Sequence, residues 1–151
     1  SCLYWFNLLS GDDGSMFNIK SKMKKLFVII ILFSLAAKGG EVNSWECNKY
    51  EGAKIIGEDG EYLGELGPSW KTDSIYNSSS QYSSTWSSSS IFNSNSKYGN
   101  SYSSTSAFNE SASEPPKIIT NDGDVKYLSV GPSWDSSRLH PYDFKYTCDW
   151  D

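Results

Sequence analysis

Residues 74–109 contain a sixteen-residue repeat, and this feature constrains the fold more than any other in the chain. The segment SIYNSSSQYSSTWSSS is followed by SIFNSNSKYGNSYSST and then by SAFN. Self-similarity at a fixed period is the sequence signature of a repeat architecture. Four columns open the copies: Ser74, Ser90 and Ser106; Ile75, Ile91 and Ala107; Tyr76, Phe92 and Phe108; and Asn77, Asn93 and Asn109.

The composition of the repeat argues against a helix and favours turns. Serine, asparagine and glycine fill each copy, and the polar side chains compete with a helix for backbone hydrogen bonds. Lys97 is the only charged residue between Asp73 and Glu110, and aromatic residues recur at fixed places, whereas disordered chains are typically charged and poor in aromatics. Regular Ser and Asn columns suit Asx and Ser/Thr turns, in which the side chain binds its own backbone. We therefore predict a turn-rich coil over residues 74–116 that buries the aromatic column headed by Tyr76.

Two alternatives to this coil remain open at the level of sequence. The aromatic residues of the repeat all fall on even numbers, which also suits one face of an extended strand. A Ser-rich tract with interspersed aromatics is also typical of flexible linkers and of low-complexity segments that associate with themselves.

The beginning of the chain has the pattern of an export signal. We expect residues 1–15 to be translated upstream sequence, because the signal pattern starts only after them. From a start at Met16 or Met23, lysines precede the apolar run Leu26–Leu35, and two alanines then open a stretch of small residues. This order of basic, apolar and small residues is typical of a signal peptide, which we assign to residues 16–39.

The remainder of the chain, residues 40–151, is expected to be one small exported domain, periplasmic or extracellular. The apolar run, extended to Ala37, spans twelve residues, whereas a membrane-spanning helix needs about 20; an uncleaved anchor and a buried core helix are the alternatives. Nine basic and sixteen acidic residues follow Ala37, a net charge of −7. This charge argues against nucleic-acid and anionic-membrane partners, which need a basic patch, so membrane contact is expected only through an uncleaved signal segment.

Cys2 lies in the segment that we expect to be upstream sequence, so it is left out of the count. The domain then contains two cysteines, Cys47 and Cys148, near its opposite ends. An even pair in an oxidising compartment predicts a disulfide. A redox-active or nucleophilic thiol is the alternative, but the chain has no Cys-x-x-Cys motif of the kind that lowers a thiol pKa.

Residues 54–70 and 117–134 are two copies of one pattern, KIIGEDGEYLGELGPSW and KIITNDGDVKYLSVGPSW. In each copy a β-branched run is followed by Asp-Gly, a Tyr-Leu strand and Gly-Pro-Ser-Trp. Asp-Gly between two such runs predicts a β-hairpin with a type I′ turn, which needs positive φ at both central residues. Residues 142–148 alternate aromatic and polar side chains, which predicts a half-buried final strand, and we expect another strand at about residues 44–49.

These elements predict an all-β or irregular fold, a small domain in which two duplicated hairpins and terminal strands flank the turn-rich coil. A pair of hairpins alone is marginally stable in water. Aromatic side chains from the coil would therefore complete the core, and the disulfide would hold the chain ends together.

The strand YLGELG, the run SIYN…QYSS…SIFN…KYGNSYSSTSAFN and the following PPKII resemble a repeat found in many exported bacterial proteins of unknown function. In that family the unit is approximately Ser-x-x-Asn-x-Tyr-Gly-x-Tyr-Gly-Ser-x-Tyr-Ser, and the resemblance covers about residues 61–128. This chain has serine at 79, 80 and 83, where the family often has glycine or aromatic residues. The resemblance implies export and a repeat architecture but no activity.

The sequence predicts no catalytic, metal or cofactor site. His140, the only histidine, could form a triad with a serine and an acid such as Asp143, but the chain has no Gly-x-Ser-x-Gly elbow. The Asp-Gly turns at Asp59 and Asp122 offer oxygen ligands for calcium, but neither is followed by the glutamate that completes an EF-hand. Turn formation explains the same residues.

Asn77 and Asn109 begin Asn-x-Ser sequences that match the N-glycosylation pattern. The equivalent Asn93 does not, because Asn95 stands where Ser or Thr is required. The asparagine column is therefore expected to have a structural role independent of sugar.

The leading functional expectation is an exported, non-catalytic binding or surface-interaction module, with a glycan or protein surface as its unknown partner. Four aromatic residues could stack on such a partner, unless they belong to the core. The second class is a self-associating subunit of an extracellular assembly or filament, since low-charge Ser/Asn/Tyr tracts can pair edge to edge. A small secreted hydrolase that uses His140 is the third class. The four candidate stacking residues are Tyr82, Trp86, Tyr98 and Tyr102.

Overall fold

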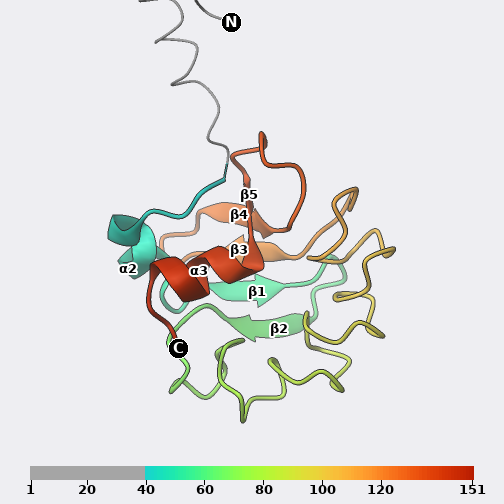
Figure 1. Cartoon of the computed structure of the whole chain (residues 1–151), viewed down its shortest axis with the longest axis horizontal. Helices are drawn as coiled ribbons and strands as arrows, with labels where there is room; N and C mark the ends of the chain where they lie inside the picture. The colour runs from blue at the N-terminus through green and yellow to red at the C-terminus, as the bar shows by residue number, and fades with distance from the viewer. Residues whose placement is uncertain (1–39) are drawn as a thin grey trace, which may run out of the picture. The chain divides into compact units, whose positions relative to one another are not determined.

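The structure, a computed structural model, describes residues 40–151 (Figure 1). This part of the chain forms a five-stranded mixed sheet in the order β2-β1-β3-β4-β5, accompanied by short helices. The predicted irregular, mostly β fold is confirmed, while the segments assigned to residues 1–15 and 16–39 lie outside the described residues. The elements are η2 (Ser44–Glu46), α2 (Cys47–Tyr50), β1 (Lys54–Ile56), β2 (Tyr62–Glu65), β3 (Lys117–Ile119), β4 (Val125–Leu128), β5 (Arg138–Leu139) and α3 (Pro141–Thr147).

Both predicted hairpins are confirmed, since β1 pairs antiparallel with β2 and β3 with β4. The predicted type I′ turn is wrong. In each turn only the glycine has positive φ, 83° at Gly60 and 86° at Gly123, and the aspartate before it does not. The glycine N–H donates to the carbonyl three residues earlier, at 3.0 Å in both turns. This is the pattern of a type I turn followed by a left-handed glycine, which spares Asp59 and Asp122 a strained conformation.

The two hairpins join through their first strands. β1 lies antiparallel to β3 with Ile55 opposite Ile118, so the middle residues of the two Lys-Ile-Ile strands face each other. The copies are therefore related by an approximate two-fold axis at this pair. After each Gly-Pro-Ser-Trp segment the chain returns parallel to the second strand of its own hairpin, Ser74 beside Glu65 and β5 beside β4. The duplicated sequence thus follows a duplicated backbone path.

The hydrophobic core lies on one face of the sheet. In Figure 1, α3 lies in front of the sheet, and the coil runs from β2 around to β3. Phe144 of α3 is fully buried, with its ring stacked on Trp150 at 6.1 Å and edge-on to Tyr50 at 5.1 Å. The fully buried aliphatic side chains of the strands are Ile55, Leu63, Ile118 and Leu128.

The strand predicted at residues 142–148 is wrong, because α3 occupies this segment. Phe144 is fully buried, but Tyr142 and Tyr146, which share its face in a strand, are exposed. The helix starts where His140 Nδ1 accepts the Tyr142 N–H (3.2 Å) and where a proline stands at the first helical position, which needs no N–H donor. The apparent alternation arises because aromatic residues happen to occupy both faces of a short helix.

The strand expected at about residues 44–49 is also wrong, since η2 and α2 each form a single helical turn. The turn begins where the Glu46 carboxylate accepts the Asn43 N–H (3.2 Å). The predicted disulfide is confirmed between Cys47 and Cys148, whose Cα atoms are 5.5 Å apart. It ties α2 to the residue that follows α3.

The coil consists of the predicted Asx and Ser/Thr turns. At its start the Ser74 carbonyl accepts the Asn77 N–H (3.1 Å), and the Ser74 hydroxyl oxygen accepts the Tyr76 N–H (3.1 Å). Successive turns start three, three, four, three and three residues apart, which accounts for the sixteen-residue period. The side chains that accept the N–H two residues later are Ser74, Asn77, Ser80, Ser84, Ser87, Ser90, Asn93, Asn100, Ser103, Ser106 and Asn109.

The asparagine column binds each copy to the residues before it. Each Asn Nδ2 donates to a carbonyl six residues earlier, at 2.8 Å from Asn77, 3.0 Å from Asn93 and 2.9 Å from Asn109. The amide oxygen of each meanwhile accepts a backbone N–H. Both ends of the side chain are thus occupied, which is the structural role expected of this column.

The coil turns its serine and aliphatic columns inward. Ser74, Ser90 and Ser106, with Ile75, Ile91 and Ala107, are fully buried. Of the aromatic column only Tyr76 is buried, while Phe92 and Phe108 lie partly buried against the core. The extended-strand alternative is wrong for this segment, because its residues follow turns throughout.

Candidate functional site

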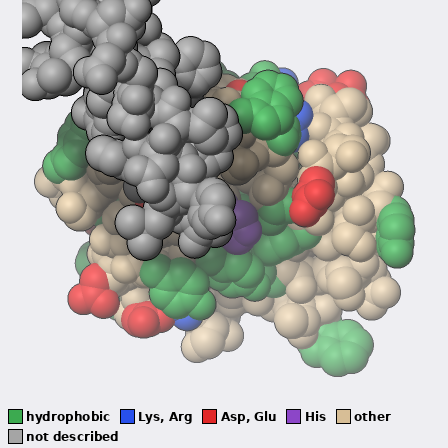
Figure 2. Space-filling view, turned by 45° about the horizontal axis from the view of Figure 1, so that its top comes forward, with side chains coloured by type: hydrophobic (Ala, Val, Ile, Leu, Met, Phe, Trp, Pro, Cys, Tyr) green, Lys and Arg blue, Asp and Glu red, His purple; other side chains and the backbone are tan. Residues whose placement is uncertain are grey.

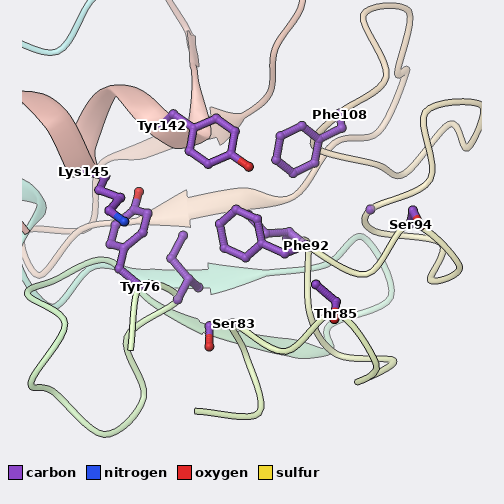
Figure 3. Close-up of a pocket in the computed structure, with 11 residues that line it drawn as sticks. Tyr76, Ser83, Thr85, Phe92, Ser94, Phe108, Tyr142 and Lys145 are labelled. Carbon is purple, nitrogen blue, oxygen red and sulfur yellow. The ribbon is translucent and has the colours of Figure 1, made fainter. Parts of the chain in front are cut away.

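An open hollow of about 460 Å³ lies between the coil and α3, and we name it the aromatic groove. Its rings come from the coil column Tyr76, Phe92 and Phe108 and from Tyr142 of α3. Figure 3 shows Phe92, Phe108 and Tyr142 turned toward one another from these two elements. Figure 2 shows hydrophobic side chains gathered on the face of the domain that carries the histidine.

Three rings of the groove form a triangle. The centroids of Phe92 and Phe108 are 5.9 Å apart, and each lies 5.8 Å from that of Tyr142, with planes inclined by 37° to 52°. Such tilted pairs contribute about 0.5–1.5 kcal/mol each beyond their burial. Yet Tyr142 remains 39% exposed, and neither phenylalanine is fully covered. The rings therefore hold one another in place while their outer faces stay open to a ligand.

Tyr76 closes one end of the groove. Its hydroxyl donates to the Pro141 carbonyl at 2.5 Å, which fastens the coil to the first residue of α3. Burial raises the pKa of Tyr76 well above its ordinary value, so the phenol stays protonated and keeps donating. The ring lies 6.3 Å from Trp150 in the core, which gives the groove a rigid base.

The polar edge of the groove carries hydroxyls and one cation. The Ser83 hydroxyl donates to the Asn77 carbonyl, whereas those of Thr85 and Ser94 make no hydrogen bond within the described residues. Lys145 Nζ lies 2.9 Å from a carboxylate oxygen of Asp151, and this hydrogen bond raises the pKa of Lys145. The lysine charge is thus neutralised locally, so the groove offers an apolar floor with hydroxyls beside it.

The four predicted stacking residues are not brought together. Tyr82 packs edge-on against Tyr62, with ring centroids 5.2 Å apart, and Tyr98 is buried. Only Trp86 and Tyr102, at equivalent positions of successive copies, are free to stack, being 87% and 93% exposed. The alternative that these aromatic residues belong to the core therefore holds for Tyr98. Tyr82 is half-buried.

Lys97, the one charge inside the repeat, anchors the coil to the first hairpin. Its Nζ lies 2.5 Å from one carboxylate oxygen of Asp59, and the Tyr98 hydroxyl donates to the other at 2.7 Å. The Lys97 hydrogen bond, followed by that from Tyr98, holds the pKa of Asp59 well below its usual range. Burial, with the bond to Asp59, raises the pKa of Tyr98 to about 12. Within residues 40–151, no group of three or more His, Cys, Asp or Glu side chains is placed to hold a metal ion.

His140 has a structural role at the start of α3. Its Nδ1 accepts the Tyr142 N–H at 3.2 Å and lies 4.0 Å from Asp143 Oδ1. Burial raises the pKa of Asp143, and the nearby His140 opposes this rise. In the part of the chain that the structure describes, no serine hydroxyl hydrogen-bonds to His140, so the residues suggested for a triad are not assembled.

Sequence reasoning missed Tyr142 as a site residue because it placed this residue in a strand. The signal that could have found it is His-Pro followed by an acidic residue, a helix start, which puts Tyr142 in the first turn. For Phe92 and Phe108 the sequence indicated burial, and only the packing shows that one side of each ring is uncovered.

Comparison of the chain with protein-family models, with curated proteins and with solved structures finds no match. The class defined by fold and site is therefore stated from the molecule itself: a small, disulfide-linked, irregular β domain that carries an open aromatic groove. None of the helices among residues 40–151 combines the length and the apolar character that a bilayer-spanning segment requires.

Proposed function

We propose that this protein is an exported, non-catalytic binding module, and that the aromatic groove holds an apolar or aromatic group of its partner. The observation that carries the proposal is the triangle of partly exposed rings at Phe92, Phe108 and Tyr142. Concave, mostly apolar sites with a few polar groups at the edge are the usual form of ligand pockets.

The surroundings of the groove support binding rather than simple core packing. Core rings of this domain, such as Phe144 and Trp150, are buried, whereas the groove rings keep uncovered area on a firmly held frame. Covering apolar area contributes about 25 cal/mol per Å² to binding. Because the groove is already formed, none of this free energy is needed to order its side chains. Preorganisation of this kind favours affinity.

Export is supported by two features. The disulfide Cys47–Cys148 fits an oxidising compartment, and the basic, apolar and small-residue order before residue 40 is typical of a signal peptide. The intact mass of the purified protein tests this part: it would show removal of a segment ending near residue 39 and two fewer hydrogens than the reduced form.

The binding proposal is tested by selection from two libraries, phage-displayed peptides and a glycan array. Any ligand selected by the parent is then titrated against the double variant Phe92→Ala/Phe108→Ala, and against Tyr102→Ala as a control that removes an exposed ring outside the groove. We expect the double variant to bind at least one selected ligand about tenfold more weakly, as for interface aromatics, with the control unchanged. Equal affinity of parent and double variant for every selected ligand, or blank selections from both libraries, would refute the proposal.

Self-association in an extracellular assembly is a second candidate, and one observation favours it. Trp45, Trp70, Trp86 and Trp134 are each at least 75% exposed, so their rings are available to stack on a second copy of the domain. Sedimentation velocity over a wide concentration range tests it. A single monomer peak at the highest concentration would argue against assembly.

A further inference from the structure

A second hollow, of about 640 Å³, lies beside Trp134 and is separate from the aromatic groove. It is formed where the Gly-Pro-Ser-Trp loop of the second hairpin meets the last copy of the coil. We name it the tryptophan hollow. Its lining comes from Glu110 and Ser111 of the coil and from residues 130–134 of the loop.

The backbone around this hollow is fixed. The Val130 N–H donates to the Ala107 carbonyl at 2.9 Å. A Cβ on Gly131 would lie 2.1 Å from the Glu110 carbonyl oxygen, so only glycine allows coil and loop to approach this closely. The Asp135 N–H donates to the Pro132 carbonyl at 3.0 Å and closes the turn that presents the Trp134 ring. Coil and loop therefore hold their side chains at a set separation.

The polar side chains that line the hollow have no partners among the described residues. Trp134 is 77% exposed. Within the described residues, the Glu110 carboxylate and the Ser111 and Ser133 hydroxyls make no hydrogen bond or ion pair, and none of these side chains is buried. A flat indole face thus stands beside an unpaired carboxylate and two free hydroxyls.

The first hairpin supplies a natural comparison. Its Gly-Pro-Ser-Trp ends at Trp70, which is 75% exposed on an equivalent turn, closed by the Lys71 N–H and the Pro68 carbonyl at 3.0 Å. Here Lys71 Nζ lies over the indole at 6.0 Å from its centroid and pairs with Glu51 at 3.1 Å. The two tryptophans therefore share sequence, turn and exposure but differ in the chemistry beside the ring.

We propose that the tryptophan hollow binds a pyranose sugar of a neutral or amino-sugar glycan. The C–H face of a pyranose packs on an indole face, since the aromatic face carries negative charge density and attracts weakly positive hydrogens. The Glu110 carboxylate would accept hydrogen bonds from sugar hydroxyls, or from an amino-sugar cation, with the strength of charge-assisted bonds. Uronic acids are excluded, because their carboxylates would meet Glu110 in a domain of net negative charge.

The test titrates the ¹⁵N-labelled protein with four soluble probes: cellotetraose, maltotetraose, chitosan tetrasaccharide and tetragalacturonic acid. The readout is the indole Nε1–H signal of Trp134, with that of Trp70 as internal control. We expect at least one of the first three probes to shift the Trp134 signal saturably, without a matching shift at Trp70, and the galacturonate to leave both unchanged.

Variants identify the groups responsible. Trp134→Ala should abolish binding, Trp70→Ala should leave it intact, and Glu110→Gln should weaken it about tenfold, as expected for loss of a charge-assisted hydrogen bond. Phe92→Ala should bind the sugar normally, so failure of the aromatic-groove proposal is distinguishable from failure of this one. The inference is overturned if none of the three probes shifts Trp134, if Trp70 responds equally, if the galacturonate binds as well as the others, or if Trp134→Ala retains affinity.

Discussion

Replacing Ser74 by alanine tests whether the serine columns hold the coil together. The Ser74 hydroxyl is fully buried, donates to the Gly67 carbonyl at 2.6 Å and accepts the Tyr76 N–H at 3.1 Å. Alanine removes both bonds and leaves a buried carbonyl and a buried N–H without these partners, at about 1–3 kcal/mol for each group. We expect the free energy of unfolding to fall by about 2–6 kcal/mol, a large share of the roughly 5–15 kcal/mol typical of a domain.

The assay is urea unfolding at pH 7, followed by tryptophan fluorescence and far-UV circular dichroism. Ser78→Ala is the matched control, because Ser78 is exposed and makes no hydrogen bond within the described residues, and we expect a change within about 0.5 kcal/mol. Ser106→Ala should fall between them, at about 1–2 kcal/mol, since its hydroxyl makes one bond there, accepting the Phe108 N–H at 3.0 Å. Equal urea midpoints for the Ser74 and Ser78 variants would refute the reasoning.

Three further predictions concern the rest of the fold. Replacing Cys47 and Cys148 together by alanine removes a link across 101 residues, which stabilises the folded state by about 4.7 kcal/mol in the chain-entropy model. For a domain of this size, calorimetry should then show a fall in Tm of about 20 °C. An unchanged Tm would contradict this prediction. Asp59→Asn should lower Tm at pH 7, because Lys97 holds the pKa of the Asp59 carboxyl below its usual range. The stabilisation is present above the unfolded-state pKa of about 3.9 and is lost as the pH falls through the folded-state value, so the difference from the parent should shrink between about pH 4 and pH 2; a pH-independent difference would count against the ion pair. Gly99→Ala should destabilise by about 1–3 kcal/mol, since its Cβ would lie 2.3 and 2.4 Å from two backbone carbonyl oxygens, and an unaltered urea midpoint would show that the coil can shift there.

Local chemistry explains which elements sequence reasoning found. Asp-Gly between β-branched runs led to both hairpins, and the Ser and Asn columns led to turns, because in each case the backbone is directed by side chains one to three residues away. The wrong strand at residues 142–148 also came from a local pattern. In a helix of only seven residues, the helical period of 3.6 residues cannot be distinguished from the two-residue alternation of a strand. The N-cap and first-turn proline were the more informative signals there.

The candidate site was less accessible to such reasoning. The aromatic column of the coil was visible as a pattern, but its fate depends on what packs above it. Tyr76 is covered by the start of α3, to which it donates a hydrogen bond, and by Trp150. Phe92 and Phe108 pack instead against Tyr142, which is itself 39% exposed and leaves them partly uncovered. Likewise Tyr98 and Tyr102 both belong to the second copy of the repeat, yet one is buried beside Asp59 and the other faces solvent.

By itself the sequence determined the turns of the coil and the two hairpins, because these depend on short-range hydrogen bonds. It also indicated the Cys47–Cys148 disulfide, because these are the two cysteines among residues 40–151. Tertiary structure alone decided that the hairpins meet through β1 and β3 and which rings of the repeat stay open. Those outcomes depend on contacts between segments tens of residues apart in the sequence, such as Ile55 with Ile118 and Tyr98 with Asp59. No local pattern specifies such contacts, since many pairings would bury the same apolar side chains.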